Sequence, residues 1–257
     1  MRLDDFLFKN QYFDSRTKAN QSIKRGEVYL NGVQVIKPSF FVNENIDNNV
    51  MISSERSFVS LGGYKLDKAL RDFNFNVNGL VCADIGSSTG GFTDCLLQNG
   101  AKKVYSVDLN DDLLHNSLKL NERVVRIIKN AKLLTKNDFN DKIDLIVGDL
   151  SFISLTAIIN VLYDLIEQSK YVILLIKPQF ELEVKKKVKN GIVRDKTDRL
   201  NACKKIYQCA ISNGFSVVNF TNAPISKDKN VEYLILLKKS NEISLDFNIL
   251  FNKYNLF

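Results

Sequence analysis

The fold is decided by the stretch Val81-Cys82-Ala83-Asp84-Ile85-Gly86-Ser87-Ser88-Thr89-Gly90-Gly91-Phe92-Thr93. Its apolar beginning predicts a strand that ends at Asp84, and the small residues that follow predict a tight turn. A helical pattern continues through Leu97. A strand, a glycine-rich turn and a helix are typical of a doubly wound parallel sheet, in which ligands bind outside the carboxyl ends of the strands. The sequence therefore predicts an α/β fold with a ligand at this turn.

The spacing within the turn distinguishes two kinds of cofactor. A dinucleotide fold favours G-x-G-x-x-G, whereas Asp84-x-Gly86-x-Ser88-x-Gly90 resembles the S-adenosylmethionine fingerprint, with Ser88 at its middle glycine. The next predicted strand ends in Asp108, whose carboxylate can accept hydrogen bonds from a ribose diol. We therefore expect a methyltransferase rather than a dehydrogenase. The expected cofactor-binding residues are Asp84, Gly86, Ser87, Gly90, Gly91, Phe92, Asp108 and Asp149.

Composition excludes some classes of protein. The chain has 257 residues, enough for one α/β domain and a small additional one. No apolar run approaches the roughly 20 residues that span a bilayer, so we expect a soluble protein. The net charge of +7 favours a polyanionic partner, although a lysine-rich surface alone would give the same balance.

The numbers and spacing of cysteine and histidine residues limit the kinds of active site that the chain can form. The four cysteines have no C-x-x-C spacing and no signal peptide precedes Arg2, which favours a reducing cytoplasm. His115 is the sole histidine, which argues against a serine triad or a histidine-rich zinc site. We expect no metal, and chemistry that depends on Lys, Asp and Glu.

The first fifty residues have the pattern of a compact unit. The spacing predicts a short helix from Leu3, a second helix that Asp14 or Ser15 could cap, and a hairpin with Asn31-Gly32 as its two-residue turn. The segment 43–58 is polar, and its end is the expected linker. Basic residues cluster around the two helices: Arg2, Arg16, Lys18, Lys24 and Arg25.

Motifs of this unit resemble the RNA-binding domain of ribosomal protein S four. They are Met1-Arg2-Leu3-Asp4, Ser15-Arg16-x-Lys18-Ala19, Ile23-Lys24-x-Gly26-x-Val28, Asn31-Gly32 and Lys37-Pro38. In that family the basic helical face lies on structured RNA, in agreement with a charged helix pair that contacts phosphates and shape. The five basic residues are therefore the expected RNA contacts, and the alternative is a solvated charged face.

The remainder of the chain alternates between strands and helices. A helix is expected from the Val59–Leu66 motif through Phe73, another around 113–120, and the last two strands could form a hairpin. The predicted fold class is a doubly wound, Rossmann-like methyltransferase sheet with a small α+β amino-terminal RNA-binding domain. The expected domains are 1–58, the RNA-binding domain and linker, and 59–257, the methyltransferase.

Four charged residues mark positions where this fold places reactive groups. Asp149 and Lys177 follow apolar strands, Glu232 precedes the last strand, and Lys65 lies near the start of the first helix of the sheet domain. A ribose hydroxyl is a poor nucleophile at neutral pH, so an enzyme that methylates it needs a base. Lysine can serve if partial burial and a second cation disfavour its ammonium form, while carboxylates orient it.

The order Lys65, Asp149, Lys177, Glu232 resembles the K-D-K-E tetrad of FtsJ-type 2′-O-ribose methyltransferases. The whole chain resembles the TlyA family, also called haemolysin A, whose members methylate the ribose of cytidine in ribosomal RNA. The resemblance implies four catalytic residues, S-adenosylmethionine as cofactor, and ribosomal RNA or a ribosomal subunit as partner. It rests on 59–66, 84–93, 149–155, Lys177-Pro178-Gln179-Phe180-Glu181, Gly191-Ile192-Val193-Arg194-Asp195 and Asn230-Val231-Glu232-Tyr233. Two positions depart from the family: Leu61 stands where Arg is expected, and Ile127 where an acidic residue often lies.

Three alternatives remain open at this stage. Asp149-Leu150-Ser151-Phe152 is similar to the N-P-P-Y motif of base amino-methyltransferases but has no proline. A non-catalytic RNA-binding protein and a membrane-active haemolysin are the others, and no segment has the length or amphipathic pattern that a membrane-active protein needs.

The resemblance also bears on the substrate. A shorter type in that family resembles enzymes that act on large-subunit rRNA, and a longer type with added terminal segments also modifies small-subunit rRNA. Because this chain begins directly at Arg2-Leu3-Asp4, we expect large-subunit rRNA. The segment 241–257 is less decisive, since its apolar residues could form a docking helix. The oligomeric state is not predicted.

Overall fold

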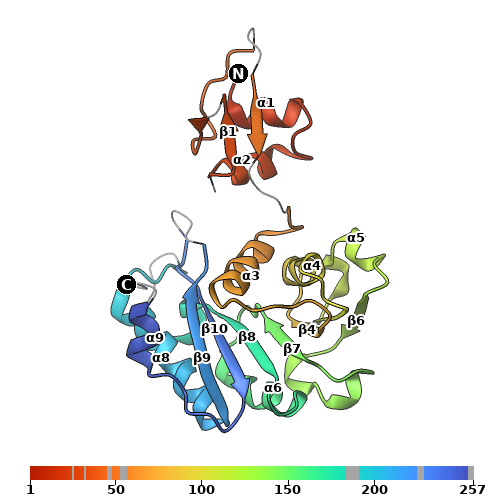
Figure 1. Ribbon diagram of the computed structural model, residues 1–257, viewed down its shortest axis with the longest axis vertical. Coiled ribbons are helices and arrows are strands. Elements are labelled where there is room, and N and C mark those ends of the chain that lie inside the picture. Colours follow the sequence, from red (N-terminus) through yellow and green to blue (C-terminus); the bar gives the residue numbers. More distant parts are fainter. Residues whose placement is uncertain are drawn as a thin grey trace. The chain divides into compact units, whose positions relative to one another are not determined.

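The computed structural model describes residues 1–24, 26–31, 33–44, 48–52, 57–182, 191–224 and 229–253. The chain forms two compact units, Met1–Ser57 and Phe58–Phe257, whose elements are labelled in Figure 1. Arg25, an expected RNA contact, and Gly32, half of the expected turn, lie outside the described residues.

The first unit packs two helices against a three-stranded antiparallel sheet. Ser15 Oγ accepts a hydrogen bond from the Lys18 amide at 3.2 Å, which confirms Ser15 as the cap of the second helix. Leu30 pairs with Val33 across the predicted two-residue turn, so the hairpin is confirmed. The elements are α1 (Leu3–Lys9), α2 (Arg16–Lys24), β1 (Val28–Leu30), β2 (Val33–Gln34) and β3 (Val50–Ile52), with sheet order β2-β1-β3.

The third strand was not predicted. β3 lies inside the polar segment 43–58 and pairs with β1 from Val28 opposite Ile52 to Leu30 opposite Val50. Three residues of strand are too short for an alternating pattern to be recognised. The strand is stabilised by its pairing with β1, which joins residues 20 to 24 positions apart in the sequence.

Asp4 is a buried carboxylate at the start of α1. Its Oδ1 lies 3.0 Å from Arg2 Nε, and its Oδ2 lies 3.4 Å from Arg16 Nε. The hydrogen bond from Arg2 lowers the pKa of Asp4 to about 2, with further help from Asn20 and Arg16. Two of the basic residues expected to contact RNA therefore also hold the first unit together.

Asp4→Asn is expected to destabilise the first unit by about 1 to 2 kcal/mol at pH 7, because hydrogen bonds to a charged group are lost. The loss stays small because both arginines are half-exposed. A pKa that is lower in the folded state means stability that is present above pH 4 and lost as the pH falls toward 2. Calorimetry of the full chain between pH 2 and pH 7 measures both effects. Equal stability of the variant and the parent at pH 7 would contradict this role.

The second unit is built on a seven-stranded sheet of order β6-β5-β4-β7-β8-β10-β9. Its strands are parallel except β10, which is antiparallel to both β8 and β9, so the predicted terminal hairpin is confirmed. The strands are β4 (Val81–Ile85), β5 (Lys103–Asp108), β6 (Val124–Ile128), β7 (Leu145–Gly148), β8 (Tyr171–Ile176), β9 (Phe215–Asn222) and β10 (Tyr233–Lys239).

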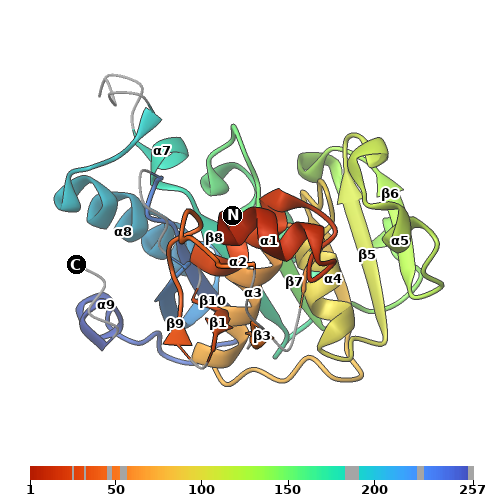
Figure 2. The same cartoon turned by 90° about the horizontal axis from the view of Figure 1, so that it is seen from above.

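Helices cover both faces of this sheet, as the doubly wound prediction requires. Side chains of α3 and α4 pack on one face and those of α6, α8 and α9 on the other. β5 and β6 lie at one end of the sheet, and α8 and α9 at the other (Figure 2). The helices are α3 (Leu61–Asp72), α4 (Gly91–Gln98), α5 (Asn116–Lys119), α6 (Ile159–Leu165), α7 (Pro178–Glu181), α8 (Lys196–Ser212) and α9 (Phe247–Lys253).

The carboxyl-terminal helix α9 packs on its own unit. Phe247, Leu250 and Phe251 are buried in the core, and the Phe251 ring lies 5.4 Å from that of Phe220. These apolar residues of the segment 241–257 therefore stabilise the sheet rather than remain available for docking. Across the described ranges, no helix has both the length and the apolar character that crossing a membrane requires.

The single helix expected at 113–120 is wrong. The segment forms a 3-10 turn, Asp111–Leu113, and the short helix α5, separated by Leu114 in an extended conformation. The Asn110 side chain accepts a hydrogen bond from the Asp112 amide, and His115 Nδ1 accepts one from the Ser117 amide. Because both side chains cap local turns, the segment cannot continue as one helix.

The strand order places the site. β4 lies between β5 and β7, so the chain direction across the sheet reverses at β4. The register sets Asp84 beside Val147 and Ile85 beside Val107. The glycine-rich turn, Asp108 and Asp149 therefore leave the sheet at neighbouring carboxyl ends, where doubly wound folds bind ligands.

Candidate active site

The glycine-rich turn between β4 and α4 is held by its neighbour β5. The amides of Gly86 and Ser87 both donate to the Val107 carbonyl, at 2.8 and 3.1 Å. Ser88 has φ of +48°, in the left-handed region that suits the glycine of the cofactor fingerprint. Its amide donates to Asp108 Oδ2 at 2.8 Å. Ser88 thus adopts a backbone conformation that glycine reaches more readily.

The last two glycines of the turn serve the packing of the protein. Gly90 has φ of +89°, and a Cβ there would lie 2.2 Å from Leu118 Cδ1. A Cβ on Gly91 would lie 2.3 Å from Ser60 Oγ, where α4 meets the start of α3. Gly90 does not line the cavity described below, so its requirement comes from the turn and from the core.

Asp84 is fully buried and only partly satisfied. Its Oδ2 accepts hydrogen bonds from the Thr93 amide at 2.9 Å and the Thr93 hydroxyl at 2.7 Å. Its Oδ1 has no hydrogen-bond partner among the residues that the structure describes. Burial raises the pKa of Asp84 to about 7, and Asp149 adds to the rise. A buried, unpaired carboxylate oxygen at a ligand site calls for a cationic donor from the ligand.

A cavity of about 140 Å³ lies above the turn. It combines expected cofactor residues with Lys177 of the tetrad. Asp108 and Gly90 are not part of its lining, and Asp108 instead closes the turn through Ser88. Four lining residues were not predicted from the sequence: Ser60, Gly62, Thr89 and Ser151. The described lining is Ser60, Gly62, Asp84, Gly86, Ser87, Ser88, Thr89, Gly91, Phe92, Asp149, Ser151 and Lys177.

The four residues of the predicted tetrad meet beside this cavity. Lys177 Nζ lies 2.6 Å from Asp149 Oδ1, and Lys65 Nζ lies 3.9 Å from Asp149 Oδ2. Lys65 Nζ also lies 2.6 Å from Glu232 Oε2. The four side chains come from α3, the end of β7, the end of β8 and the start of β10, so the sheet topology brings them together.

Asp149 lies between the two lysines. Lys65 and Lys177 therefore share one carboxylate, which keeps the second cation expected from the sequence close to Lys177. Lys177 Nζ also donates to Ser151 Oγ at 2.7 Å, and the Lys177 side chain is only 11% exposed. Two ammonium groups and two carboxylates give the tetrad a formal charge of zero, which makes its burial tolerable.

Glu181 fastens the two loops that carry Asp149 and Lys177. It is buried at the end of α7, and its carboxylate accepts hydrogen bonds from Ser154 Oγ at 2.5 Å and the Leu155 amide at 2.8 Å. Burial raises the pKa of Glu181. The sequence placed Glu181 in a motif but gave no role for it, because the loops it joins are 26 residues apart.

The basic residues of the first unit are mostly paired with acids. Arg2 and Arg16 contact Asp4, and Lys18 Nζ lies 2.7 Å from Asp14 Oδ2. Their side chains remain between 40% and 50% exposed. Lys24 is exposed at the end of α2. All four side chains are accessible to a polyanion, although three of them are already paired with an acidic side chain.

The structure places the two departures from the family pattern in regular elements of the second unit. Leu61 is the first residue of α3, in the second unit. Ile127 lies in β6, partly buried against the core, where it contributes packing in place of a carboxylate.

Two family models match the chain. Residues 58–240 match the FtsJ-like methyltransferases, and residues 1–45 match the S4 domain. The first match covers most of the unit that contains the tetrad, and the second covers most of the unit with the basic helices.

Three curated relatives align with most of the chain. Hemolysin A of Brachyspira hyodysenteriae is 42% identical over 91% of this chain and 98% of that protein. The 16S/23S rRNA (cytidine-2′-O)-methyltransferase TlyA of Mycobacterium tuberculosis is 34% identical over 95% of this chain and 92% of that protein. The 23S rRNA (cytidine-2′-O)-methyltransferase TlyA of Campylobacter jejuni is 34% identical over 91% of this chain and 97% of that protein.

A solved structure also resembles the chain over most of its length. It is described as a hemolysin from Streptococcus thermophilus and is 34% identical to this chain. The match covers 96% of this chain and 91% of that one, with a TM-score of 0.71.

Proposed function

This chain belongs to the FtsJ-like methyltransferase family, and we propose from that premise that it methylates the ribose 2′-hydroxyl of a cytidine in ribosomal RNA. The observation that carries the proposal is the tetrad of Lys65, Asp149, Lys177 and Glu232 beside a cavity with an unpaired buried carboxylate. Relatives at 34% identity carry this activity in their names. The intact contacts of the tetrad favour an enzyme over a non-catalytic RNA-binding protein.

The residues of the cavity fit S-adenosylmethionine. Asp84 Oδ1 offers a buried acceptor to the ammonium of the methionyl group, and the turn from Gly86 to Ser88 offers backbone close to the ligand. Asp108 uses three of about four lone-pair directions on Ser88, Leu109 and Asn110, so it can offer one more to a ribose hydroxyl. When bound, the cofactor supplies an electrophilic methyl group on a sulfonium.

Lys177 is the group proposed to take the proton of the attacking 2′-hydroxyl. It directly follows the inner strand β8 and lines the cavity, whereas Lys65 comes from α3. Only a neutral amine can accept a proton, so this role requires that Lys177 lose its own proton before the 2′-hydroxyl reacts. With the cofactor bound, transfer of its methyl group to the 2′-oxygen would release the hydroxyl proton, and Lys177 Nζ would accept it. The leaving thioether is neutral, so no acid is required.

The other three residues position Lys177. Asp149 contacts Lys177 and Lys65, and Glu232 holds Lys65 at 2.6 Å. Ser151 Oγ accepts a hydrogen bond from Lys177 Nζ at 2.7 Å. These contacts fix the direction of Nζ, and catalysis by a base depends on that geometry before it depends on basicity.

Phe152 supports a nucleotide substrate at this site. Its side chain is 91% exposed, and its φ of +64° is unusual for a bulky residue. Its ring lies 5.3 Å from Phe180, whose ring in turn lies 6.0 Å from Lys177 Nζ. An exposed aromatic ring held beside the reacting group gives a base a surface for stacking.

We assign RNA affinity to the first unit and the chemistry to the second. Lys18→Gln with Lys24→Gln is expected to weaken binding of ribosomal RNA and lower the slope of log affinity against log salt by about 1.4, since each lost phosphate contact removes about 0.7. Both lysines lie on α2 outside the Asp4 cluster, so the fold should persist. Filter binding across a salt series measures the slope. An unchanged slope would remove α2 from the RNA surface.

Lys204→Gln provides the matched control for this pair. Lys204 is exposed on α8, and no ion pair or hydrogen bond involves it within the described part of the chain. The control therefore removes a lysine charge without disturbing a contact, and it should leave the salt slope unchanged.

The large subunit is the proposed substrate. Of the three curated relatives, the two named as rRNA methyltransferases both have 23S rRNA in their names, whereas only one has 16S rRNA. Purified large subunits from a strain lacking this protein should accept labelled methyl groups, and small subunits should accept few. Transfer to both subunits at comparable rates would contradict the restriction, and transfer to neither would contradict the proposed function.

A further inference from the structure

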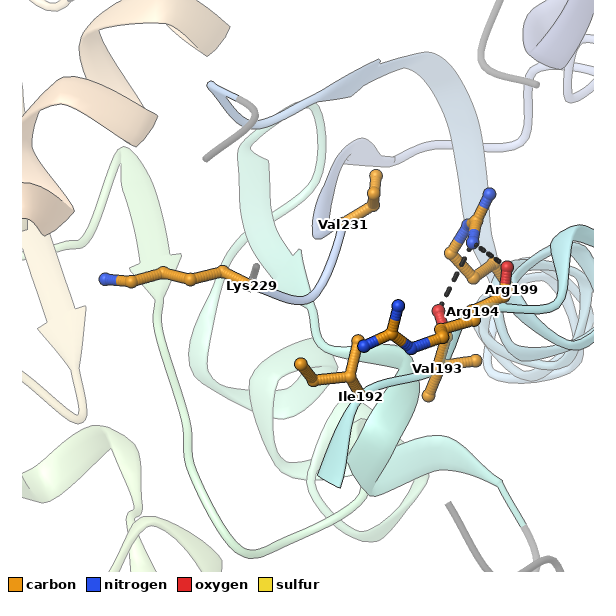
Figure 3. Close-up of a pocket in the computed structure, with 6 residues that line it drawn as sticks. All are labelled: Ile192, Val193, Arg194, Arg199, Lys229 and Val231. Atoms are coloured by element: carbon orange, nitrogen blue, oxygen red, sulfur yellow. Dashed lines mark hydrogen bonds between the residues drawn. The ribbon is translucent and has the colours of Figure 1, made fainter. Parts of the chain in front are cut away.

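A second pocket of about 270 Å³ opens in the methyltransferase unit and carries no role in the account so far. Three of its described lining residues are cations, three are aliphatic, and none is a carboxylate. Figure 3 shows them: Ile192, Val193, Arg194, Arg199, Lys229 and Val231. They come from the Gly191–Asp195 motif, the start of α8 and the segment before β10. A pocket lined by cations of one sign attracts an anion.

The two segments that form this pocket are fastened to each other. Asn230 Nδ2 donates to the Gly191 carbonyl at 2.8 Å, and Asn230 Oδ1 accepts from the Val193 amide at 2.8 Å. Arg199 donates to the carbonyls of Val193 and Arg194 at 3.2 and 2.7 Å, as the dashed lines in Figure 3 indicate. The pocket is therefore preformed rather than assembled by its ligand.

Two of the three cations are available to a ligand. The Arg199 guanidinium already donates hydrogen bonds to these carbonyls and to the Tyr233 hydroxyl, the last at 3.2 Å. Arg194 and Lys229 are exposed, and neither side chain has a hydrogen bond or ion pair among the described residues. In Figure 3 the Arg194 guanidinium points toward the segment that carries Lys229, and the Lys229 side chain extends away on the far side. The nearby Asp195 is the N-cap of α8, where its side chain accepts from the Asp198 amide.

The pocket adjoins the catalytic tetrad through the chain itself. Val231 lines it, and the next residue is Glu232, which holds Lys65. The Glu232 carbonyl accepts a hydrogen bond from the Ala223 amide at 2.9 Å, so this segment is also tied to the end of β9. A ligand that contacts Val231 in the pocket is therefore one residue along the chain from the tetrad.

We propose that this pocket binds a backbone phosphate of the RNA strand, next to the target nucleotide, through Arg194 and Lys229; the proposal rests on the proposed function. A guanidinium matches the geometry of a phosphate by two parallel hydrogen bonds, and a lysine adds a point charge. Ile192 and Val231 give the adjoining sugar an apolar wall. Such a contact carries no sequence information, and its effect is to fix the register of the strand over Lys177.

The test compares three variants of the full chain that each remove one positive charge. Arg194→Gln and Lys229→Gln alter the pocket, and Lys204→Gln on α8 is the control. Each pocket variant should weaken the affinity for a large-subunit rRNA transcript about 10-fold, at the lower end for hydrogen bonds to a charged group. It should also lower the salt slope by about 0.7. In the methylation assay it should raise KM for RNA and leave kcat and cofactor affinity unchanged, which is the pattern of lost uniform binding.

Two results would overturn the proposal. One is an affinity and a salt slope equal to those of Lys204→Gln. The other is a lower kcat with unchanged KM, since that would give Arg194 a structural or catalytic role. The salt slope is measured by RNA binding alone, without methylation, so it tests the pocket independently of the proposed function. A parent protein that binds RNA but transfers no methyl group would contradict the proposed function. The salt slope would then still test the pocket.

Discussion

Lys177→Ala is expected to lower the rate constant for methyl transfer by about 10²- to 10⁴-fold, the usual contribution of a positioned base. The affinity for cofactor and RNA should remain. The reason is positional: Lys177 ends β8, lines the cavity, and is aimed by Asp149 at 2.6 Å and Ser151 at 2.7 Å. Single-turnover measurements with saturating cofactor and RNA separate the chemical step from binding.

Lys177→Arg discriminates a base from a positioning cation. A guanidinium stays protonated, so the variant keeps the positive charge beside Asp149 but cannot accept a proton. We expect Lys177→Arg to be as inactive as Lys177→Ala, and Lys204→Ala on α8 to retain full activity. Substantial turnover by Lys177→Arg would remove the base role and leave Lys177 as a positioning cation.

Asp84→Asn is expected to weaken S-adenosylmethionine binding by about 10- to 100-fold, the range for losing a hydrogen bond to a charged group. The substitution keeps the shape of the side chain and an oxygen for Thr93, which donates to Oδ2 from its amide and its hydroxyl. It removes the acceptor that Oδ1 offers inside the cavity. Isothermal calorimetry at pH 8 measures the affinity.

The same variant should stabilise the free protein at pH 8. The pKa of Asp84 is raised by burial to about 7 in the folded protein, so ionising it opposes folding. Stability from this group is complete below pH 4 and is lost as the pH rises through 7. Asp84→Asn removes that loss, so its unfolding temperature should exceed that of the parent at pH 8 in the absence of cofactor. Unchanged cofactor affinity, or a less stable protein at pH 8, would contradict the role given to Asp84.

Much of the second unit could be predicted because its signals are local. The strand, turn and helix from Val81 to Leu97 follow from apolar runs and glycines that are close in the sequence. The positions of Asp149, Lys177 and Glu232 at strand ends follow from the same patterns. The resemblance to the TlyA family, drawn from motifs, is confirmed by relatives at 34% to 42% identity.

The parts that could not be predicted depend on contacts between distant segments. Asp149 lies between Lys65 and Lys177 because α3 brings Lys65 to the sheet from 84 positions earlier in the chain. Glu181 joins two loops, and Gly90 avoids the side chain of Leu118. None of these relations leaves a periodic trace in the sequence, since each depends on the order of the strands.

The electrostatic properties of Asp84 also come from the fold. The sequence shows only an aspartate at this position. Its pKa rises because the fold covers β4 on both faces and buries the carboxylate. The pocket of Arg194 and Lys229 is similar, because Asn230 and Arg199 create it by joining two segments. The motifs can be recognised in the sequence, but the contacts between them depend on the fold.

The nature of the modified nucleoside tests the central claim most directly. Large subunits from a strain that lacks this protein are incubated with the purified chain and S-adenosylmethionine carrying a labelled methyl group. The rRNA is then digested to nucleosides and analysed by mass spectrometry. The account predicts 2′-O-methylcytidine, with the label on the ribose fragment. Label on the base fragment, or on no nucleoside while the cofactor is bound, would contradict it.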